Sequence, residues 1–217
     1  MYSEIAAFTH QHHVTLVAVS KTQPVEAIQA LYDMGQRDFG ENKVQEMTEK
    51  QTQLPDDIRW HLIGHLQKNK VKYIAPFVHM IHAVESTELL TTIQQQALKH
   101  NRQIKVLLQF HIADEDTKYG MNLEEAIQLI ENVRAIPFPN IILSGVMGMA
   151  TFTENMEQVR KEFRHLKNIF DTIKSQFFPN DDAFCHISMG MSGDYPIAIA
   201  EGATMVRIGS AIFGARN

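Results

Sequence analysis

Eight short runs of apolar and β-branched residues alternate with longer segments of helical character along this chain of 217 residues. The segment 122–134 shows the helical pattern, with apolar residues three or four positions apart on one face. The expected strands are 14–20, 37–40, 59–64, 78–84, 104–112, 141–149, 183–188 and 205–209. The expected helices between them are 24–34, 42–51, 68–74, 86–100, 122–134, 154–176 and 193–201. Such alternation requires crossover connections, which predict a parallel sheet.

The number of units favours a closed sheet over an open one. Eight repeats in about 200 residues predict an α/β fold, a single TIM-type (β/α)8 barrel, although an open doubly wound sheet has the same local pattern. Segment 1–13 would then supply the eighth helix, and Ser86 and Asn122 are expected helix N-caps. No linker or change in composition divides the chain, so one domain, 1–217, is expected.

Composition limits the classes of function. Apolar residues make up 44% and charged residues 21%, which allows a full core. The net charge of −5 argues against general affinity for nucleic acid. A single cysteine, Cys185, rules out an internal disulfide, and no run of about 18 apolar residues or signal-peptide pattern is present. A cytoplasmic protein without a nucleic-acid or membrane partner is expected.

Two expected strand ends at the C-terminal side of the chain suggest an anion site. Ser188 and a glycine-rich run follow the seventh strand, and Gly209 and Ser210 follow the eighth. Phosphate sites of barrels commonly form from the loops after these two strands, because glycine lets backbone N–H groups approach an anion. Each run alone is also compatible with a simple tight turn. Their joint placement favours phosphate.

Two cations lie at the same expected rim. Lys21 ends the first strand, where it is either a solvated strand end or a partly desolvated amine that attacks carbonyls. Arg207 lies within the eighth strand, where it either pairs with a rim carboxylate or donates to a ligand. A lysine amine facing a phosphate site suits an aldehyde that carries a phosphate. Pyridoxal 5′-phosphate (PLP) is such a molecule, and its ring nitrogen would accept from Arg207.

Several longer motifs then resemble one family over essentially the whole chain. These motifs are LVAVSKT (16–22), FGENKVQE (39–46), WHLIGHLQKNK (60–70), KYG (118–120) and SMGMSGDYPIAIAEGATMVRIGSAIFGAR (188–216). They resemble the PLP homeostasis proteins, which implies a barrel similar to the N-terminal domain of alanine racemase. The chain departs from the family pattern in GVMGM (145–149) and at Ala203, both conservatively in size.

The resemblance implies a role for each matching residue. Lys21 matches the lysine that forms an imine with PLP, and Arg207 matches the arginine at the pyridine nitrogen. Asn42 matches an asparagine near the ring. The phosphate-binding positions are matched by Ser188, Gly209 and Ser210, and the resemblance places His65 and Met147 at the pocket lining.

The implied function is PLP binding and control of its intracellular level, with PLP-dependent apoenzymes as recipients. The rival interpretation is a PLP-dependent amino-acid racemase, which needs a base on each face of the substrate Cα. The resembling racemases take their second base, a tyrosine, from a further domain and the partner subunit. The chain ends at Asn217, just after the eighth strand, so we expect no catalytic residues and at most weak racemisation.

Other polar candidates receive less specific interpretations. His61 and His65 have a spacing that suits a metal only on a helix, whereas they flank an expected strand end, so no metal site is predicted. Cys185 falls inside an expected buried strand and is assigned to packing. Glu41 is a candidate general base or a helix cap.

Overall fold

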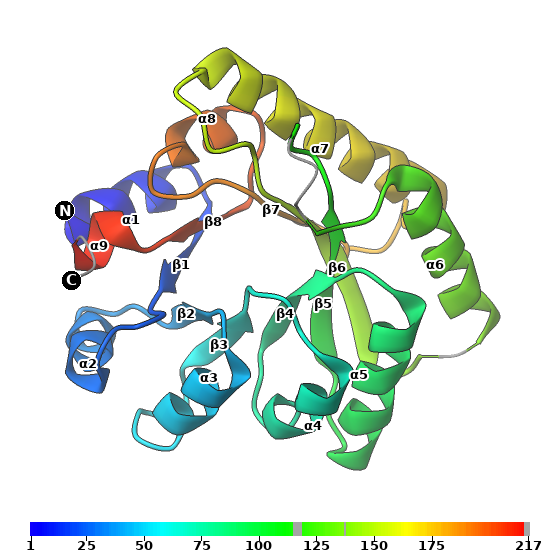
Figure 1. Cartoon of the computed structure of the whole chain (residues 1–217), viewed down its shortest axis with the longest axis horizontal. Helices are drawn as coiled ribbons and strands as arrows, with labels where there is room; N and C mark the ends of the chain where they lie inside the picture. Colours follow the sequence, from blue (N-terminus) through cyan, green and yellow to red (C-terminus); the bar gives the residue numbers. More distant parts are fainter. Residues whose placement is uncertain (115–118, 137, 215–217) are drawn as a thin grey trace.

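The computed structural model describes residues 1–114, 119–136 and 138–214. Its centre is a closed barrel of eight parallel strands in the order β1 to β8, with β8 paired back to β1 (Figure 1). The strands are β1 (Thr15–Val19), β2 (Asp38–Glu41), β3 (Arg59–Leu62), β4 (Met80–Val84), β5 (Ile104–Phe110), β6 (Ile141–Gly148), β7 (His186–Ser188) and β8 (Met205–Ile208). The predicted TIM-type barrel is confirmed.

Helices surround the barrel and connect successive strands (Figure 1). They are α1 (Tyr2–Gln11), α2 (Val25–Asp33), α3 (Val44–Gln51), η1 (Lys68–Lys70), α4 (Val71–Ile74), α5 (Thr87–Lys99), α6 (Leu123–Ala135), α7 (Met156–Phe177), α8 (Tyr195–Ala200) and α9 (Ser210–Phe213). Segment 1–13 does supply a helix, α1, which packs against β1. The short α9 was not predicted.

Two predicted caps hold their helices in place. The Ser86 hydroxyl accepts from the Leu89 amide at the start of α5. Asn122 and Glu125 form a reciprocal capping box at the start of α6. Side chains here satisfy amides that the first helical turn leaves without partners.

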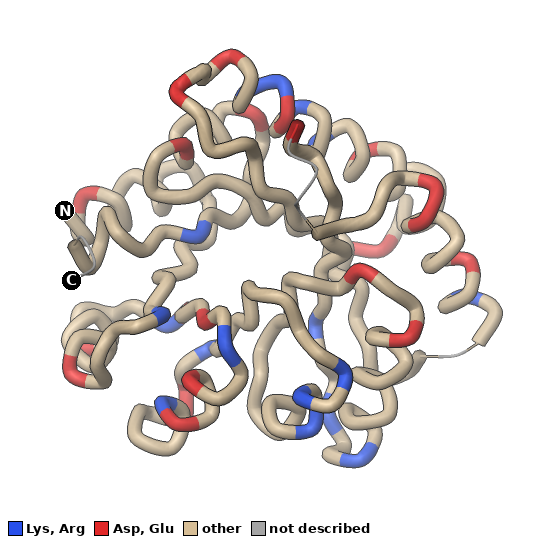
Figure 2. Tube along the Cα trace, in the orientation of Figure 1, with Lys and Arg blue, Asp and Glu red and all other residues tan. Residues whose placement is uncertain are grey.

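The core has two layers, because a closed barrel has an inner face and an outer face that is covered by helices. The larger layer fills the space between the helices and the outer barrel wall. A smaller cluster lies inside the barrel and consists of Val17, Met80, Ala83, Leu107, Met147 and Met205. Charged residues lie mostly on the surrounding helices and loops (Figure 2), and within the described part of the chain no helix is long and apolar enough to cross a membrane.

Strand β7 is shorter than predicted, and this changes the place of Cys185. The strand begins at His186, so Cys185 precedes it and is exposed. The expectation that Cys185 is buried in a strand was therefore wrong. The apolar run that suggested a longer strand is anchored instead by the buried Phe184, whose ring stacks on Phe170 and Phe178.

Candidate functional site

A cavity of about 780 Å³ lies at the end of the barrel where the strands finish. Its walls come mainly from the residues at and after the C-terminal ends of β1, β2, β3, β6, β7 and β8. It is lined by Val19, Lys21, Asn42, Ile63, Met149, Thr151, Phe152, Thr153, Met156, Val159, Met191, Ser192, Gly193, Asp194, Arg207, Gly209, Ser210 and Ala211. In this fold the C-terminal ends of the strands carry the chemistry, so this cavity is the candidate site.

Five of the eight residues predicted to bind a cofactor lie on this wall. Lys21 follows β1, Asn42 follows β2, and Arg207, Gly209 and Ser210 belong to β8 and the turn after it. The fold thus brings residues almost 190 positions apart in sequence to one cavity, because β1 and β8 are neighbours in the closed barrel.

The other three predicted residues lie outside the cavity lining. His65 is exposed on the rim, where its Nδ1 lies 3.1 Å from Glu85 Oε1 and its ring stacks on Tyr119. Met147 is buried in the cluster inside the barrel. Ser188 is fully buried beneath Arg207. Their assignment as cofactor-binding residues stays a prediction.

The turn that carries Lys21 has an unusual backbone conformation. Thr22 has a φ of 65°, which a β-branched residue rarely adopts. Its amide donates to Glu46 Oε1 at 2.5 Å, so a side chain of α3 holds the turn. A left-handed residue directly after Lys21 turns the chain away from the strand direction and leaves Lys21 on the cavity wall.

A buried ion-pair network supports the same turn from below. Lys50 Nζ, on α3, donates to the Ser20 carbonyl at 2.8 Å, to Glu41 Oε1 at 2.8 Å and to Glu46 Oε1 at 2.6 Å. Ser20 Oγ donates to the same Glu41 oxygen at 2.7 Å. Burial raises the pKa of the Glu41 carboxyl, against the hydrogen bonds from Lys50 and Ser20. Glu41 therefore anchors the turn and lies outside the cavity lining, so its candidacy as a general base finds no support in the geometry.

Arg207 supplies a buried positive charge at the floor of the cavity. Its Nη1 donates to Ser188 Oγ at 2.6 Å and its Nη2 donates to the Gly148 carbonyl at 3.1 Å. Burial lowers the pKa of Arg207 to about 10, and Asp194 opposes that effect. The guanidinium therefore stays protonated at neutral pH and offers only hydrogen-bond donors.

Backbone amides from the turn after β8 converge at one point of the wall. The amides of Gly209 and Ala211 both lie 3.3 Å from Ser192 Oγ, which belongs to the loop after β7. A Cβ on residue 209 would lie only 3.2 Å from the Val19 carbonyl, so glycine suits this close packing against β1. Two N–H groups and a hydroxyl at one place can bind an anion. Ser192 was missed from the sequence, where Ser188 was chosen from the same run.

His61 and His65, whose four-residue spacing would suit a metal site on a helix, lie in different environments. His61 is buried inside the barrel, whereas His65 is exposed. Among the described residues, no three His, Cys, Asp or Glu side chains gather in a way that could hold a metal ion.

Comparisons with known proteins show the family to which this chain belongs. The family described as "Alanine racemase, N-terminal domain" matches residues 2–217. A pyridoxal phosphate homeostasis protein of Aquifex aeolicus is 41% identical over 203 residues, which cover 93% of this chain and 87% of that protein. The human protein of the same name is 36% identical over 93% of this chain and 76% of its own length. This chain belongs to the pyridoxal phosphate homeostasis protein family.

Solved structures share the barrel fold of this chain. PipY of Synechococcus elongatus, solved with PLP bound, superposes with a TM-score of 0.85 at 32% identity over 98% of this chain and 99% of PipY. An alanine racemase of Clostridium difficile superposes with a TM-score of 0.75 at 15% identity, over 97% of this chain and 59% of the racemase. The second likeness shows the shared barrel alone.

Proposed function

We propose that this protein binds PLP in the barrel-mouth cavity, as an imine on Lys21, and takes part in intracellular PLP homeostasis. The observation that carries the proposal is the set of groups on one wall: an amine, a buried guanidinium, and two converging amides. The 36–41% identity to proteins named for PLP homeostasis supports the same reading.

The donor set of the cavity fits the three polar features of PLP. Arg207 lies on the floor, where a donor suits the ring nitrogen. The amides of Gly209 and Ala211, with Ser192 and Ser210, suit the phosphate. When bound, PLP supplies an aldehyde carbon, with which the Lys21 amine forms a C=N bond and releases one water. Met149 and Met191 offer apolar contact for the ring.

The cavity gives little support to the rival function, amino-acid racemisation. A racemase needs a second base opposite its lysine. Among the described lining residues the ionisable side chains are Lys21, Asp194 and Arg207. Asp194 Oδ1 accepts from the Met191 amide at 2.5 Å, and a protonated guanidinium cannot act as a base. We therefore propose a carrier without efficient catalysis.

The wider setting also forms part of the proposal. PLP-dependent apoenzymes are the proposed recipients, because a carrier that holds PLP by a reversible imine can release it to another lysine. We propose a cytoplasmic location, where such enzymes act on amino acids. Transfer is measured by mixing loaded protein with an apoenzyme and comparing the recovery of activity with that given by an equal amount of free PLP.

The imine is tested by absorbance and chemical trapping. PLP added to the purified protein should give a near-visible absorbance band, and borohydride should fix the cofactor onto the peptide that contains Lys21. Lys21→Ala should abolish the band while circular dichroism stays unchanged. Lys43→Ala, at an exposed lysine beside Asn42, is the matched control and should keep the band. Trapping on Lys68, Lys70 or Lys118 would overturn the assignment; Lys118 lies outside the described residues.

The phosphate site is tested with unphosphorylated pyridoxal, which keeps the aldehyde. Each hydrogen bond to a charged group contributes about 1.5–3 kcal/mol, so Ser192→Ala, which removes one hydroxyl, should weaken PLP binding about 10- to 100-fold. Loss of the whole phosphate removes several such bonds, so pyridoxal should bind far more weakly still. Equal affinity for pyridoxal and PLP would show that the turns after β7 and β8 do not bind phosphate.

A further inference from the structure

A chain of buried polar side chains crosses the barrel interior and ends at Arg207. Asp38 Oδ1 lies 3.0 Å from His61 Nε2, and His61 Nδ1 lies 2.9 Å from His82 Nε2. His82 Nδ1 lies 3.1 Å from Ser188 Oγ, which accepts from Arg207 Nη1 at 2.6 Å. These five residues come from five strands, β2, β3, β4, β7 and β8.

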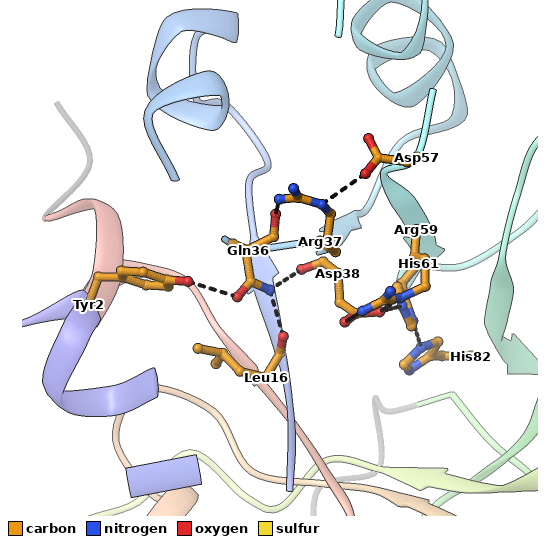
Figure 3. Close-up of polar contacts among 9 residues, drawn as sticks. All are labelled: Tyr2, Leu16, Gln36, Arg37, Asp38, Asp57, Arg59, His61 and His82. Atoms are coloured by element: carbon orange, nitrogen blue, oxygen red, sulfur yellow. Dashed lines mark hydrogen bonds and ion pairs between the residues drawn. The ribbon is translucent and has the colours of Figure 1, made fainter. Parts of the chain in front are cut away.

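The middle of the chain is enclosed by protein. His61 and His82 are 1% and 0% exposed, and Ser188 is 0% exposed. Figure 3 shows Asp38 beside His61 and the His61 ring directed toward His82. Buried polar groups without partners destabilise a fold, so each hydrogen position in this chain is constrained by the next.

The outer end of the chain is fixed as an acceptor. Arg59 donates from Nε to Asp38 Oδ1 at 2.7 Å and from Nη2 to Oδ2 at 2.5 Å. Burial alone would raise the pKa of Asp38, but the hydrogen bonds from Arg59 and His61 outweigh it and hold that pKa well below its usual range. The carboxylate is ionised and can only accept.

With both imidazole rings uncharged, the two ends of the chain together assign every proton between them. Because Asp38 only accepts, His61 Nε2 must carry hydrogen, which leaves His61 Nδ1 as an acceptor in the neutral ring. His82 Nε2 must then donate, so His82 Nδ1 accepts from the Ser188 hydroxyl. Ser188 retains its lone pairs for Arg207, which only donates. All donors in the chain point from Arg207 toward Asp38.

A neutral His82 agrees with its surroundings. Burial holds the pKa of His82 well below its usual value, and the positive charge of the nearby Arg207 acts in the same direction. A protonated ring would carry hydrogen on Nδ1, and the Ser188 hydroxyl could no longer donate there.

We propose that His61 and His82, anchored by Asp38, are positioning residues that act through Ser188 to fix the Arg207 guanidinium at the floor of the PLP cavity. The proposal rests on the proposed function, since it assigns Arg207 to the ring nitrogen of PLP. It predicts that this cavity recognises a pyridine ring because a chain reaching to β2 holds the guanidinium in one orientation.

The first test measures the protons directly in the full-length protein without ligand. Nitrogen-15 NMR of the histidine rings should show His61 and His82 as neutral rings protonated on Nε2 at neutral pH. The exposed His100 serves as the reference for a ring in water. A His82 ring protonated on Nδ1 would reverse the chain and overturn the proposal.

The second test compares PLP with its analogue in which carbon replaces the ring nitrogen. His82→Phe interrupts the chain at similar side-chain volume. It should reduce the preference for PLP over the analogue roughly 3- to 10-fold, the effect of about one hydrogen bond. His79→Phe is the matched control, because His79 lies beside His61 with ring centroids 5.4 Å apart but makes no side-chain hydrogen bond among the described residues. The control should keep the wild-type preference.

The outcomes separate this proposal from the proposed function. If wild-type protein binds neither compound, the proposed function fails. If wild-type protein prefers PLP and His82→Phe keeps the full preference, only the positioning role fails. Should His82→Phe not fold, Ser188→Ala breaks the chain beside Arg207 and carries the same expectation.

Discussion

At the scale of single residues, the site depends on side chains that never reach the cavity. Lys21 lies on the wall, but its turn is held by Lys50, Glu41 and Glu46 from β2 and α3. Lys50 and Glu41 are almost completely buried, at 8% and 0% side-chain exposure. Breaking a buried ion pair leaves an uncompensated charge, whereas removing both partners does not.

This difference gives a stability prediction for the Lys50–Glu41 pair. Lys50→Met should lower the free energy of unfolding by about 3–5 kcal/mol, because Glu41 loses its counter-ion in a dry environment. Adding Glu41→Gln to Lys50→Met should recover part of that loss. Denaturant titrations of the single and double variants measure the coupling. Lys43→Met, at the neighbouring exposed lysine, should be within about 0.5 kcal/mol of wild type. If the loss of stability in the double variant equals the sum of the losses in the two single variants, the broken ion pair is not the cause of the loss in Lys50→Met.

At the scale of elements, the strand and helix order could be predicted because the pattern is local. Burial on both faces makes each strand a short apolar run, and the intervening helices have their own period. The direction of a strand-end side chain could not be predicted in the same way. Ser188 ends β7 facing the barrel interior, while Ser192, four residues later, reaches the cavity. A one-residue change in strand register exchanges inward and outward faces, and the sequence alone leaves that register open.

Close approach of two strands gives an element-scale prediction. Gly145 on β6 has a φ of 146°, and a Cβ there would lie 1.9 Å from the His186 carbonyl oxygen on β7. Gly145→Ala should therefore push β6 and β7 apart and lower the free energy of unfolding by at least about 2 kcal/mol. Gly193→Ala is the control, since a Cβ there meets nothing within 4 Å. Thermal melts of both variants measure the effect, and equal melting temperatures would show that the strands can separate without cost.

At the scale of the whole molecule, the barrel interior is divided between an apolar cluster and a polar chain. Val17 and Met205 belong to the apolar cluster, yet Val17 is the strand partner of Arg207 in the β1–β8 register. The cluster fills the interior and the chain of Asp38, His61, His82 and Ser188 crosses it beneath the cavity. A purely apolar interior would pack as well but would leave Arg207 with fewer partners at the cavity floor.

This buried histidine content gives the molecule a predictable response to acid. Burial lowers the pKa of His79 to about 4, and it also lowers the pKa values of His82 and His186. An unfolded histidine takes up a proton near pH 6.5, so between pH 6.5 and 4 the unfolded chain binds more protons than the native one. The contribution of these rings to stability is therefore full above pH 6.5 and is lost as the pH falls. Burial raises the pKa of Glu41, so this carboxyl makes the native state more stable as the pH falls. Its single contribution opposes those of the three histidines.

We therefore expect the free energy of unfolding to decrease steadily from pH 7 to pH 4.5, as measured by urea titration at fixed ionic strength. His79→Phe should make that decrease shallower, because one group that takes up a proton on unfolding has been removed. His100→Phe, at an exposed histidine, should leave the pH dependence as in wild type. Equal slopes in His79→Phe and His100→Phe would contradict the lowered pKa of the His79 ring, and a flat profile in the wild-type protein would contradict the lowered pKa values of the three buried rings together.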